Sequence, residues 1–370
     1  MSWERTRMSR YAHIALLVVG YALVAVFLGL ILKHDFLRSD VLEYWQSSSQ
    51  WWAPFHPFHV PGYPLAIALL RGVFFKGVPP TLVMMTISFT AFLASAFLVH
   101  HMIRRSGVPD RYAVMGTYLF GLWPFVGLVN AVWPAADLPA MALLLLGLYG
   151  LLGSRRVLGG LAFGLALVTH KAMWPFVGLI VLADIFYRRP RLSWENAAAL
   201  LALLLPIGIL WVSGAVYHGS LTWIVSRNIQ NEVMPRTSLP VLDGLLGTLM
   251  RGGARGVVKG ATVAGVALLS AALVYASYRL RTPYFQFGMA ISAGVLLLSV
   301  LMNRWEIWSS VRFGRLLVLP LMWTLGHKYG TRDLPYLRPC VVTAVLLALF
   351  VSQFAFSWYT ARLYEWSAPR

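Results

Sequence analysis

The segment "RSDVLEYWQSSSQWWAPFHPFHVPGYP", residues 38–64, gathers carboxylates, imidazoles and aromatic rings in a chain that otherwise avoids polar groups. Asp40, Glu43 and Tyr44 follow a long apolar stretch, and on a helical turn these three positions share one face. A carboxylate held at a membrane surface can act as a general base toward a hydroxyl group. The spacing therefore indicates proton-transfer chemistry, and a solvated acidic loop is the alternative interpretation.

Two histidines follow in the same segment. His56 and His59 flank Pro57 in "FHPFHVP". Their imidazoles are suited to hydrogen-bond a phosphate or a sugar hydroxyl, unless they are interfacial histidines capped by water. A His-x-x-His pair with two carboxylates nearby could also assemble a metal site, which is the less favoured interpretation.

The stretch "ALVTHKAMWPF" contains His170 and Lys171. About twelve apolar residues separate the basic "GSRR" from this pair, and at 1.5 Å per residue they cover roughly 18 Å. The hydrocarbon core of a bilayer is near 30 Å thick. His170 and Lys171 should therefore lie below the membrane surface, in a cavity, where ionisable groups are functional candidates. The alternative is a lysine that extends to the interface.

A third group stands in "NRWEIWSSVRFGRLLVLP", which contains Glu306, Arg312 and Arg315. The two arginines are three positions apart and should share one helical face. Ser309 or Ser310 is predicted to cap that helix, so that its positive N-terminal end reinforces the arginines. Two guanidinium groups at such a place suit a phosphate, and arginines anchored at the interface are the alternative.

Two further features are weaker. Residues 216–259 contain Arg227 in an amphipathic segment that should lie on the membrane and either hold a lipid or serve a structural role. Asp137, in "VWPAADLPA", is predicted to be an N-cap with Pro139 just inside the helix, and the alternative is a side chain that lines the site.

Helices in a membrane must position these groups. Hydrophobic residues make up 59% of 370 and charged residues only 12%, whereas soluble domains carry roughly twice that charged fraction. At about 20 residues a span, this composition predicts an all-α polytopic protein with on the order of eleven spans. The apolar windows lie near 13–32, 81–99, 112–129, 138–153, 157–169, 172–187, 196–215, 260–277, 285–302, 311–326 and 339–357.

The charge distribution predicts the orientation. The net charge of +18 comes without a basic run or a basic-aromatic module, so we expect membrane flanks and no nucleic-acid partner. Arg5, Arg7 and Arg10 place the N-terminus in the cytoplasm, before a first span that is too long for a signal-peptide core and is expected to be retained. Cys340 is the single cysteine, which excludes disulfides within the chain and a cysteine-built metal site.

This orientation gives two modules. Residues 1–215 form a transmembrane module with the long external segment 33–80, and residues 216–370 form a second, more variable one with the external segment 216–259. An enzyme that acts on the external face, away from ATP and sugar nucleotides, would need a donor delivered on a lipid.

The first external segment resembles that of the GT-C glycosyltransferases, which are membrane enzymes that use polyprenyl-phosphate sugars. The similarity rests on "SDVLEYW...PFHPFHVPGYPLAIALL", in which Asp40 and Tyr44 fit an Asp-x-x-x-Tyr pattern and residues 61–64 fit a "PgYPl" element. The resemblance implies that Asp40 is the catalytic base, with Asp35 as the alternative. It also implies that the donor or acceptor is bound by Glu43, Tyr44, His56, His59, Tyr63, His170, Arg227 and Glu306.

A second similarity lies in Arg312-Phe313 and Pro320, which resemble an "RY" element a few residues before "lP", with Phe in place of Tyr. Relatives often have Thr-Arg where this chain has "THK", so the resemblance implies a phosphate-binding role for Lys171 beside Arg312 and Arg315. It implies an inverting, metal-independent enzyme without a cofactor, which moves one sugar, taken to be mannose, to a lipid or glycolipid acceptor. The rival functions are a transporter or flippase of a lipid-linked sugar, and a ligase that uses a diphosphate lipid.

Overall fold

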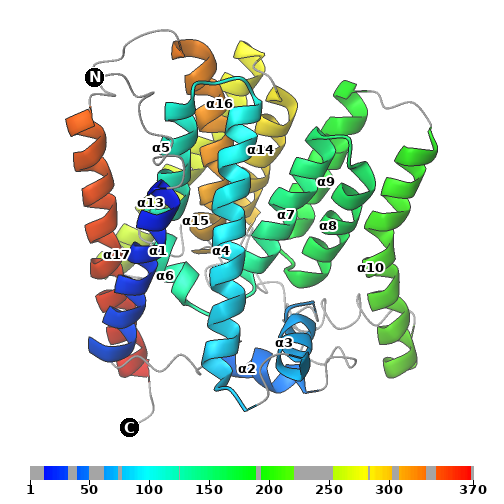
Figure 1. The fold of residues 1–370 in the computed structure, drawn as a ribbon, viewed down its shortest axis with the longest axis horizontal. Coiled ribbons are helices and arrows are strands. Elements are labelled where there is room, and N and C mark those ends of the chain that lie inside the picture. Colours follow the sequence, from blue (N-terminus) through cyan, green and yellow to red (C-terminus); the bar gives the residue numbers. More distant parts are fainter. Residues whose placement is uncertain are drawn as a thin grey trace.

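The computed structural model describes residues 12–31, 40–49, 62–73, 77–124, 126–188, 193–220, 253–281, 284–301, 308–330 and 339–367. Every regular element in these ranges is a helix, as the sequence predicts (Figure 1). The first half contains α1 (Ala12–Val26), η2 (Phe27–Ile31), α2 (Asp40–Ser48), α3 (Gly62–Val73), α4 (Pro80–Arg105), α5 (Asp110–Gly121), α6 (Gly127–Val132), α7 (Asp137–Leu152), α8 (Arg156–Thr169), α9 (Met173–Ala183) and η3 (Asp184–Arg188). The second half contains α10 (Trp194–His218), α13 (Gly253–Leu280), α14 (Phe285–Leu301), α15 (Trp308–Gly314), η5 (Arg315–Leu317), α16 (Val318–Tyr329) and α17 (Pro339–Ser367).

Three of these helices are long and apolar enough to cross a membrane. They are Pro80–Arg105, Trp194–Val216 and Gly256–Leu280, and shorter apolar stretches of 10 to 17 residues lie in other helices of the described ranges. Each apolar window of the sequence falls on one helix or on consecutive shorter elements. The all-α class is confirmed, and the number of eleven spans stays a prediction.

Two windows contain a break instead of a continuous helix. The window 112–129 is divided because α5 ends at Gly121 and α6 begins at Gly127. Pro124 has no backbone N–H to continue the helix, and a Cβ at Gly127 would lie 2.3 Å from the carbonyl oxygen of Gly121. The window 311–326 contains the 3-10 turn η5 between α15 and α16.

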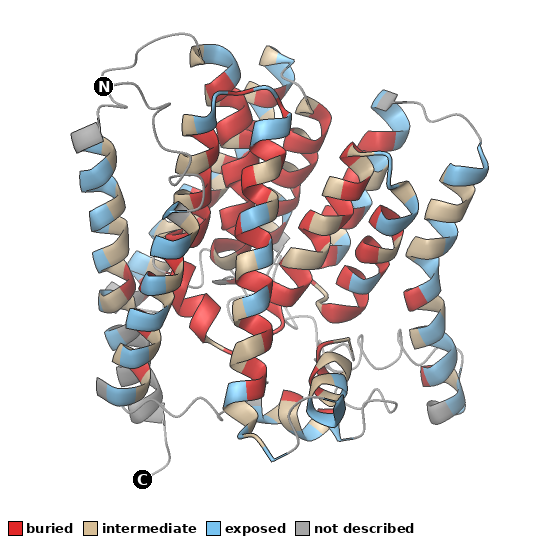
Figure 2. Ribbon diagram, viewed as in Figure 1, coloured by how far each residue is buried: buried red, intermediate tan, exposed pale blue. Residues whose placement is uncertain are grey.

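Burial follows the position of each helix in the bundle. Many residues of the central helices α4, α7, α14 and α16 are buried, while α1, α10 and α17 expose one side (Figure 2). The exposed side chains of α10 include Leu200, Leu204, Ile209 and Trp211. Large apolar groups on the outside of a helix are typical of contact with lipid.

Helix α10 packs on α8 through two small residues. A Cβ at Gly160 would lie 2.0 Å from the carbonyl oxygen of Ala199, and one at Gly164 would lie 2.3 Å from that of Leu203. Glycines four apart allow two helix backbones to approach closely. This contact holds α10 against the helices that carry the candidate site.

The ends of α7, α8 and α9 lie at a common depth in the bundle. Helix α8 has 14 residues and α4 has 26, so their lengths are about 21 and 39 Å. In Figure 1 the start of α7, the end of α8 and the start of α9 stop short of the lower ends of α4 and α10, with α2 and α3 below them. The turn with His170 and Lys171 therefore lies inward of these ends, as the short α8 predicts.

Candidate functional site

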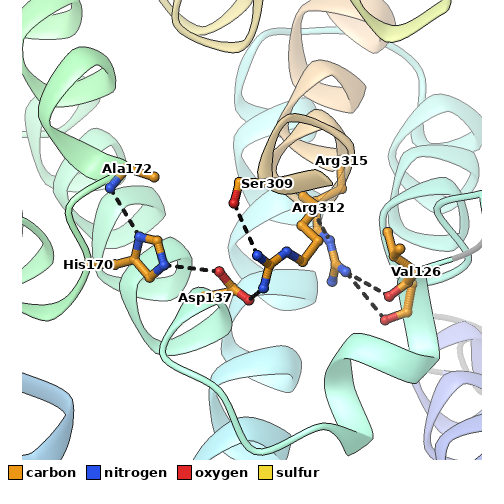
Figure 3. Close-up of polar contacts among 8 residues, drawn as sticks. Val126, Asp137, His170, Ala172, Ser309, Arg312 and Arg315 are labelled. Atoms are coloured by element: carbon orange, nitrogen blue, oxygen red, sulfur yellow. Dashed lines mark hydrogen bonds and ion pairs between the residues drawn. The ribbon is translucent and has the colours of Figure 1, made fainter. Parts of the chain in front are cut away.

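A carboxylate from the first turn of α7 lies at the centre of the site. Asp137 is 1% exposed, and its Oδ2 accepts a hydrogen bond from Nη1 of Arg312 on α15. Its Oδ1 lies 3.2 Å from Nε2 of His170, in the turn between α8 and α9 (Figure 3). Because Asp137 and Arg312 are 175 positions apart, the fold itself creates this cluster from three distant segments.

The orientation of His170 follows from its backbone contacts. Helix α8 ends at Thr169, and His170 has an extended backbone with φ −152° and ψ 129°. The N–H of Ala172 donates to its Nδ1 at 3.0 Å. A neutral imidazole that accepts at Nδ1 carries its proton on Nε2, which here faces Asp137. In this arrangement Nδ1 is bound by the backbone and Nε2 faces a carboxylate, and the role of His170 in binding a sugar or phosphate stays a prediction.

Arg312 is tethered at both terminal nitrogens. Nη1 donates to Asp137, and Nη2 donates to Oγ of Ser309 one turn earlier on α15 at 3.0 Å. Its Nε is buried and has no hydrogen-bond partner in the part of the chain that the structure describes. The side chain is 30% exposed, so the guanidinium group is fixed in direction and still partly open.

Arg315 lies behind Arg312 and is fully buried. Its Nη2 donates to the carbonyl oxygen of Val126 at 3.0 Å, and its Nε donates to the carbonyl oxygen of Arg312 at 3.2 Å. The guanidinium group also lies over the ring of Phe120, 5.5 Å from the centroid. These contacts join η5 to α5 and α6, so Arg315 stabilises the turn that carries Arg312 and adds positive charge to the site.

Two expectations about the caps of these helices are wrong. Asp137 is the first residue of α7 and makes no capping hydrogen bond, since Ala136 is the N-cap and Asp137 turns toward Arg312 and His170 instead. Ser309 and Ser310 lie inside α15, which begins at Trp308, so neither caps it. Ser309 accepts a hydrogen bond from Arg312.

The two guanidinium groups also do not form the shared face that the three-residue spacing predicts. That of Arg312 turns toward Asp137 and that of Arg315 toward Val126 (Figure 3). The physical reason is that each side chain follows its own acceptor, which is the carboxylate of Asp137 for Arg312 and the backbone carbonyl of Val126 for Arg315.

Lysines add further positive charge around Asp137. Lys171 follows His170 directly and is partly exposed. Lys259, on α13, is close enough to Arg312 for the two like charges to interact. Lys259 did not stand out in the sequence, because a lysine near the start of a membrane helix has the usual signature of a basic flank.

The segment that contains α2 and α3 reaches the same region through α3. A Cβ at Gly62 would lie 2.5 Å from the carbonyl oxygen of Val168 and 2.8 Å from Oγ1 of Thr169, so the start of α3 packs directly on the end of α8. Tyr63 is fully buried, lies beside Ser88, and is within electrostatic range of Asp137.

Helix α2 packs on this tyrosine. The ring of Tyr44 meets that of Tyr63 edge to face, with centroids 4.9 Å apart. Glu43 lies on the same helix and is partly buried, and Asp40 is the first residue of α2. Helix α2 therefore contacts Tyr63, which in turn lies within electrostatic range of Asp137.

Several predicted residues lie outside the described ranges, namely Asp35, His56, His59, Arg227 and Glu306, and the side chain of Asp40 is among the parts not described. Among the residues that are described, no group of three or more His, Cys, Asp or Glu side chains could hold a metal ion. The structure therefore connects Tyr44, Tyr63, His170, Arg312 and Arg315 to one region.

No protein-family model matches the chain, and no curated protein matches it either. Asp137 is the residue that sequence reasoning undervalued, and the available signal was a carboxylate placed between two apolar windows.

Proposed function

We propose that the protein is an inverting membrane glycosyltransferase of the GT-C type. It transfers one sugar, taken as mannose, from a polyprenyl-phosphate carrier to a lipid or glycolipid acceptor on the external face of the membrane. The observation that carries this proposal is the convergence of α2–α3, the α8–α9 turn and α15 on one cationic cluster at one end of the bundle.

In this mechanism Asp40 removes the proton from the acceptor hydroxyl. The oxygen attacks the anomeric carbon from the side opposite the phosphate, and a new C–O bond forms there. The bond from the anomeric carbon to the phosphate oxygen breaks, and its electron pair leaves with the polyprenyl phosphate. Arg312 and Lys171 stabilise the negative charge that develops on this leaving group, and Arg315 adds to the local positive potential from its buried position.

The depth of the cluster supports a donor that arrives in the membrane. The turn with Lys171 lies inward of the ends of α4 and α10 (Figure 1), so a phosphate carried on a lipid reaches it from the side of the bilayer. The proposal includes the orientation argued from the basic flanks, with the N-terminus in the cytoplasm, about eleven spans and α2 and α3 on the external side. Donor, acceptor and bilayer lipids are its partners.

Asp40→Asn tests the proposal. The change keeps the shape of the side chain and removes its ability to take a proton, so transfer should fall by roughly 10²- to 10⁴-fold. The assay measures sugar transfer from a short-chain polyprenyl-phosphate sugar to a membrane-lipid extract. Asp110→Asn is the matched control, because Asp110 is also the first residue of a helix and lies at the opposite end of α4.

The outcomes separate the alternatives. Near-normal transfer by Asp40→Asn would move the base to Asp35 or Glu43. If the wild-type protein transfers no sugar from any carrier-phosphate donor, the enzyme proposal fails and a transporter of lipid-linked sugars is favoured. Transfer from diphosphate donors alone would indicate a ligase.

A further inference from the structure

Asp137 has no role in the transfer reaction as proposed, although it is the most central charged group of the site. It is 1% exposed and its Oδ2 is bound by a guanidinium group. Its Oδ1 faces Nε2 of His170, which carries the ring proton because Nδ1 accepts from Ala172. A carboxylate enclosed in this way is poorly placed to take a proton from an acceptor, but it is well placed to hold its two partners.

The contacts of Arg312 show what such holding achieves. Asp137 fixes Nη1 and Ser309 fixes Nη2, and both lie on the outer edge of the planar group. The remaining donor, Nε–H, is buried without a hydrogen-bond partner among the described residues. An unsatisfied buried donor is unfavourable, and an anionic oxygen is the acceptor that best satisfies a guanidinium N–H.

The charge around Arg312 points to the same kind of ligand. The guanidinium group of Arg312 lies within electrostatic range of both Arg315 and Lys259, and Asp137 is bonded to Arg312 and within electrostatic range of Arg315. A second nitrogen of this cluster, Nη1 of Arg315, is also buried without a partner in the described part of the chain. Positive charge gathered at the depth of the membrane is stabilised by a bound anion.

We propose that Asp137 is a positioning residue that clamps Arg312 through Nη1, so that Nε–H donates to an oxygen of a lipid phosphate. This inference rests on the proposed function and names the residue that orients its phosphate site. His170, oriented by the backbone N–H of Ala172, lies 3.2 Å from the second carboxylate oxygen and limits the direction of the clamp.

The sign of one mutational effect distinguishes this role from simple charge. Asp137→Asn removes a negative charge next to an anion site, which by Coulomb attraction alone would tighten phosphate binding. If Asp137 instead orients Arg312, the same change weakens binding, because Arg312 loses a charge-assisted tether and its Nε–H leaves the ligand. Loss of such a bond lowers affinity by about 10- to 100-fold.

The experiment measures binding of farnesyl phosphate to the purified full-length protein in detergent, by calorimetry, with inorganic phosphate and farnesol as further probes. Asp137→Asn should weaken binding of both phosphates and leave farnesol unaffected. In an Arg312→Ala background the change at Asp137 should no longer weaken binding, because the residue acts through Arg312. Tighter or unchanged phosphate binding by Asp137→Asn, or an equal loss of farnesol binding, would overturn the proposal.

Asp184→Asn is the matched control for a general structural effect. Asp184 is also a buried carboxylate, and it lies 3.5 Å from an arginine, Arg156, at the other end of α8 and α9. Its loss should lower thermal stability without changing affinity for farnesyl phosphate. If Asp137→Asn does not fold, Asp137→Glu is the second test, because a carboxylate one methylene longer displaces Arg312. Weaker phosphate binding by Asp137→Glu supports the clamp, and unchanged binding refutes it.

Failure of this inference and failure of the proposed function give different results. A wild-type protein that binds farnesyl phosphate through the clamp and transfers no sugar would refute the enzyme and keep the clamp. A protein that transfers sugar while Asp137→Asn binds farnesyl phosphate normally would keep the enzyme and refute the clamp.

Discussion

Gly62→Ala is predicted to separate the first external segment from the cluster around Asp137. A Cβ at this position would lie 2.5 Å from the carbonyl oxygen of Val168, and real Cβ contacts are not shorter than 3.0 Å, so the two backbones must part by about 0.5 Å. Overpacking of this kind costs about 1–3 kcal/mol of stability. Because a misplacement of about 1 Å can cost 10²-fold in rate, the shift should lower sugar transfer roughly tenfold.

Gly72→Ala is the control in the same helix. No atom lies within 4 Å of a Cβ built at Gly72, so the change should leave transfer unaltered and raise stability by up to about 1 kcal/mol. The assays are thermal unfolding in detergent, followed by tryptophan fluorescence, and sugar transfer per folded molecule. If Gly62→Ala unfolds and transfers like Gly72→Ala, α3 does not position the site through its contact with α8.

Two further predictions concern the other side of the cluster. Arg312→Ala should lower kcat/KM for a polyprenyl-phosphate sugar by about 10- to 100-fold, through both a higher KM and a lower kcat, because the charge on phosphate grows as the bond breaks. The control is Arg279→Ala, which removes an exposed arginine at the far end of α13. If the two variants have equal kinetics, Arg312 is only an interfacial anchor. Gly164→Ala should cost about 1–3 kcal/mol of stability in thermal unfolding, because it forces α10 from α8, and it should leave transfer per folded molecule unchanged. Gly178→Ala, which meets nothing within 4 Å, should lower neither stability nor transfer.

The helices could be predicted because each reflects a local property of the chain. Long apolar runs between basic flanks indicate membrane helices without reference to any distant residue. The shortness of α8 followed in the same way from the apolar run before His170, which forms a helix of 14 residues. The breaks after Gly121 and at Arg315 were missed, since hydropathy records composition and not the close backbone contact at Gly127 or the tightening of one turn.

The partner of Arg312 could not be predicted, because its contact with Asp137 spans 175 positions. Locally, an Asp before Leu-Pro at the start of a helix has the pattern of an N-cap. The competing contact prevails since a charge-assisted bond to guanidinium in a buried setting is stronger than a cap bond to a backbone N–H. The part of the site on α2 and α3 was predicted as a group, and Tyr44 and Tyr63 are in contact.

Asp137 also explains how two arginines can lie so close together inside the bundle. Arg315 is fully buried beside Arg312, and two like charges in a medium of low dielectric constant repel strongly. One carboxylate offsets part of that repulsion and leaves the cluster positive. If the donor is a phosphodiester, it carries one negative charge, and its leaving group gains a second as the bond to the sugar breaks. In the proposed reaction, a site with residual positive charge therefore stabilises the leaving phosphate more than the bound donor, and that difference would accelerate transfer.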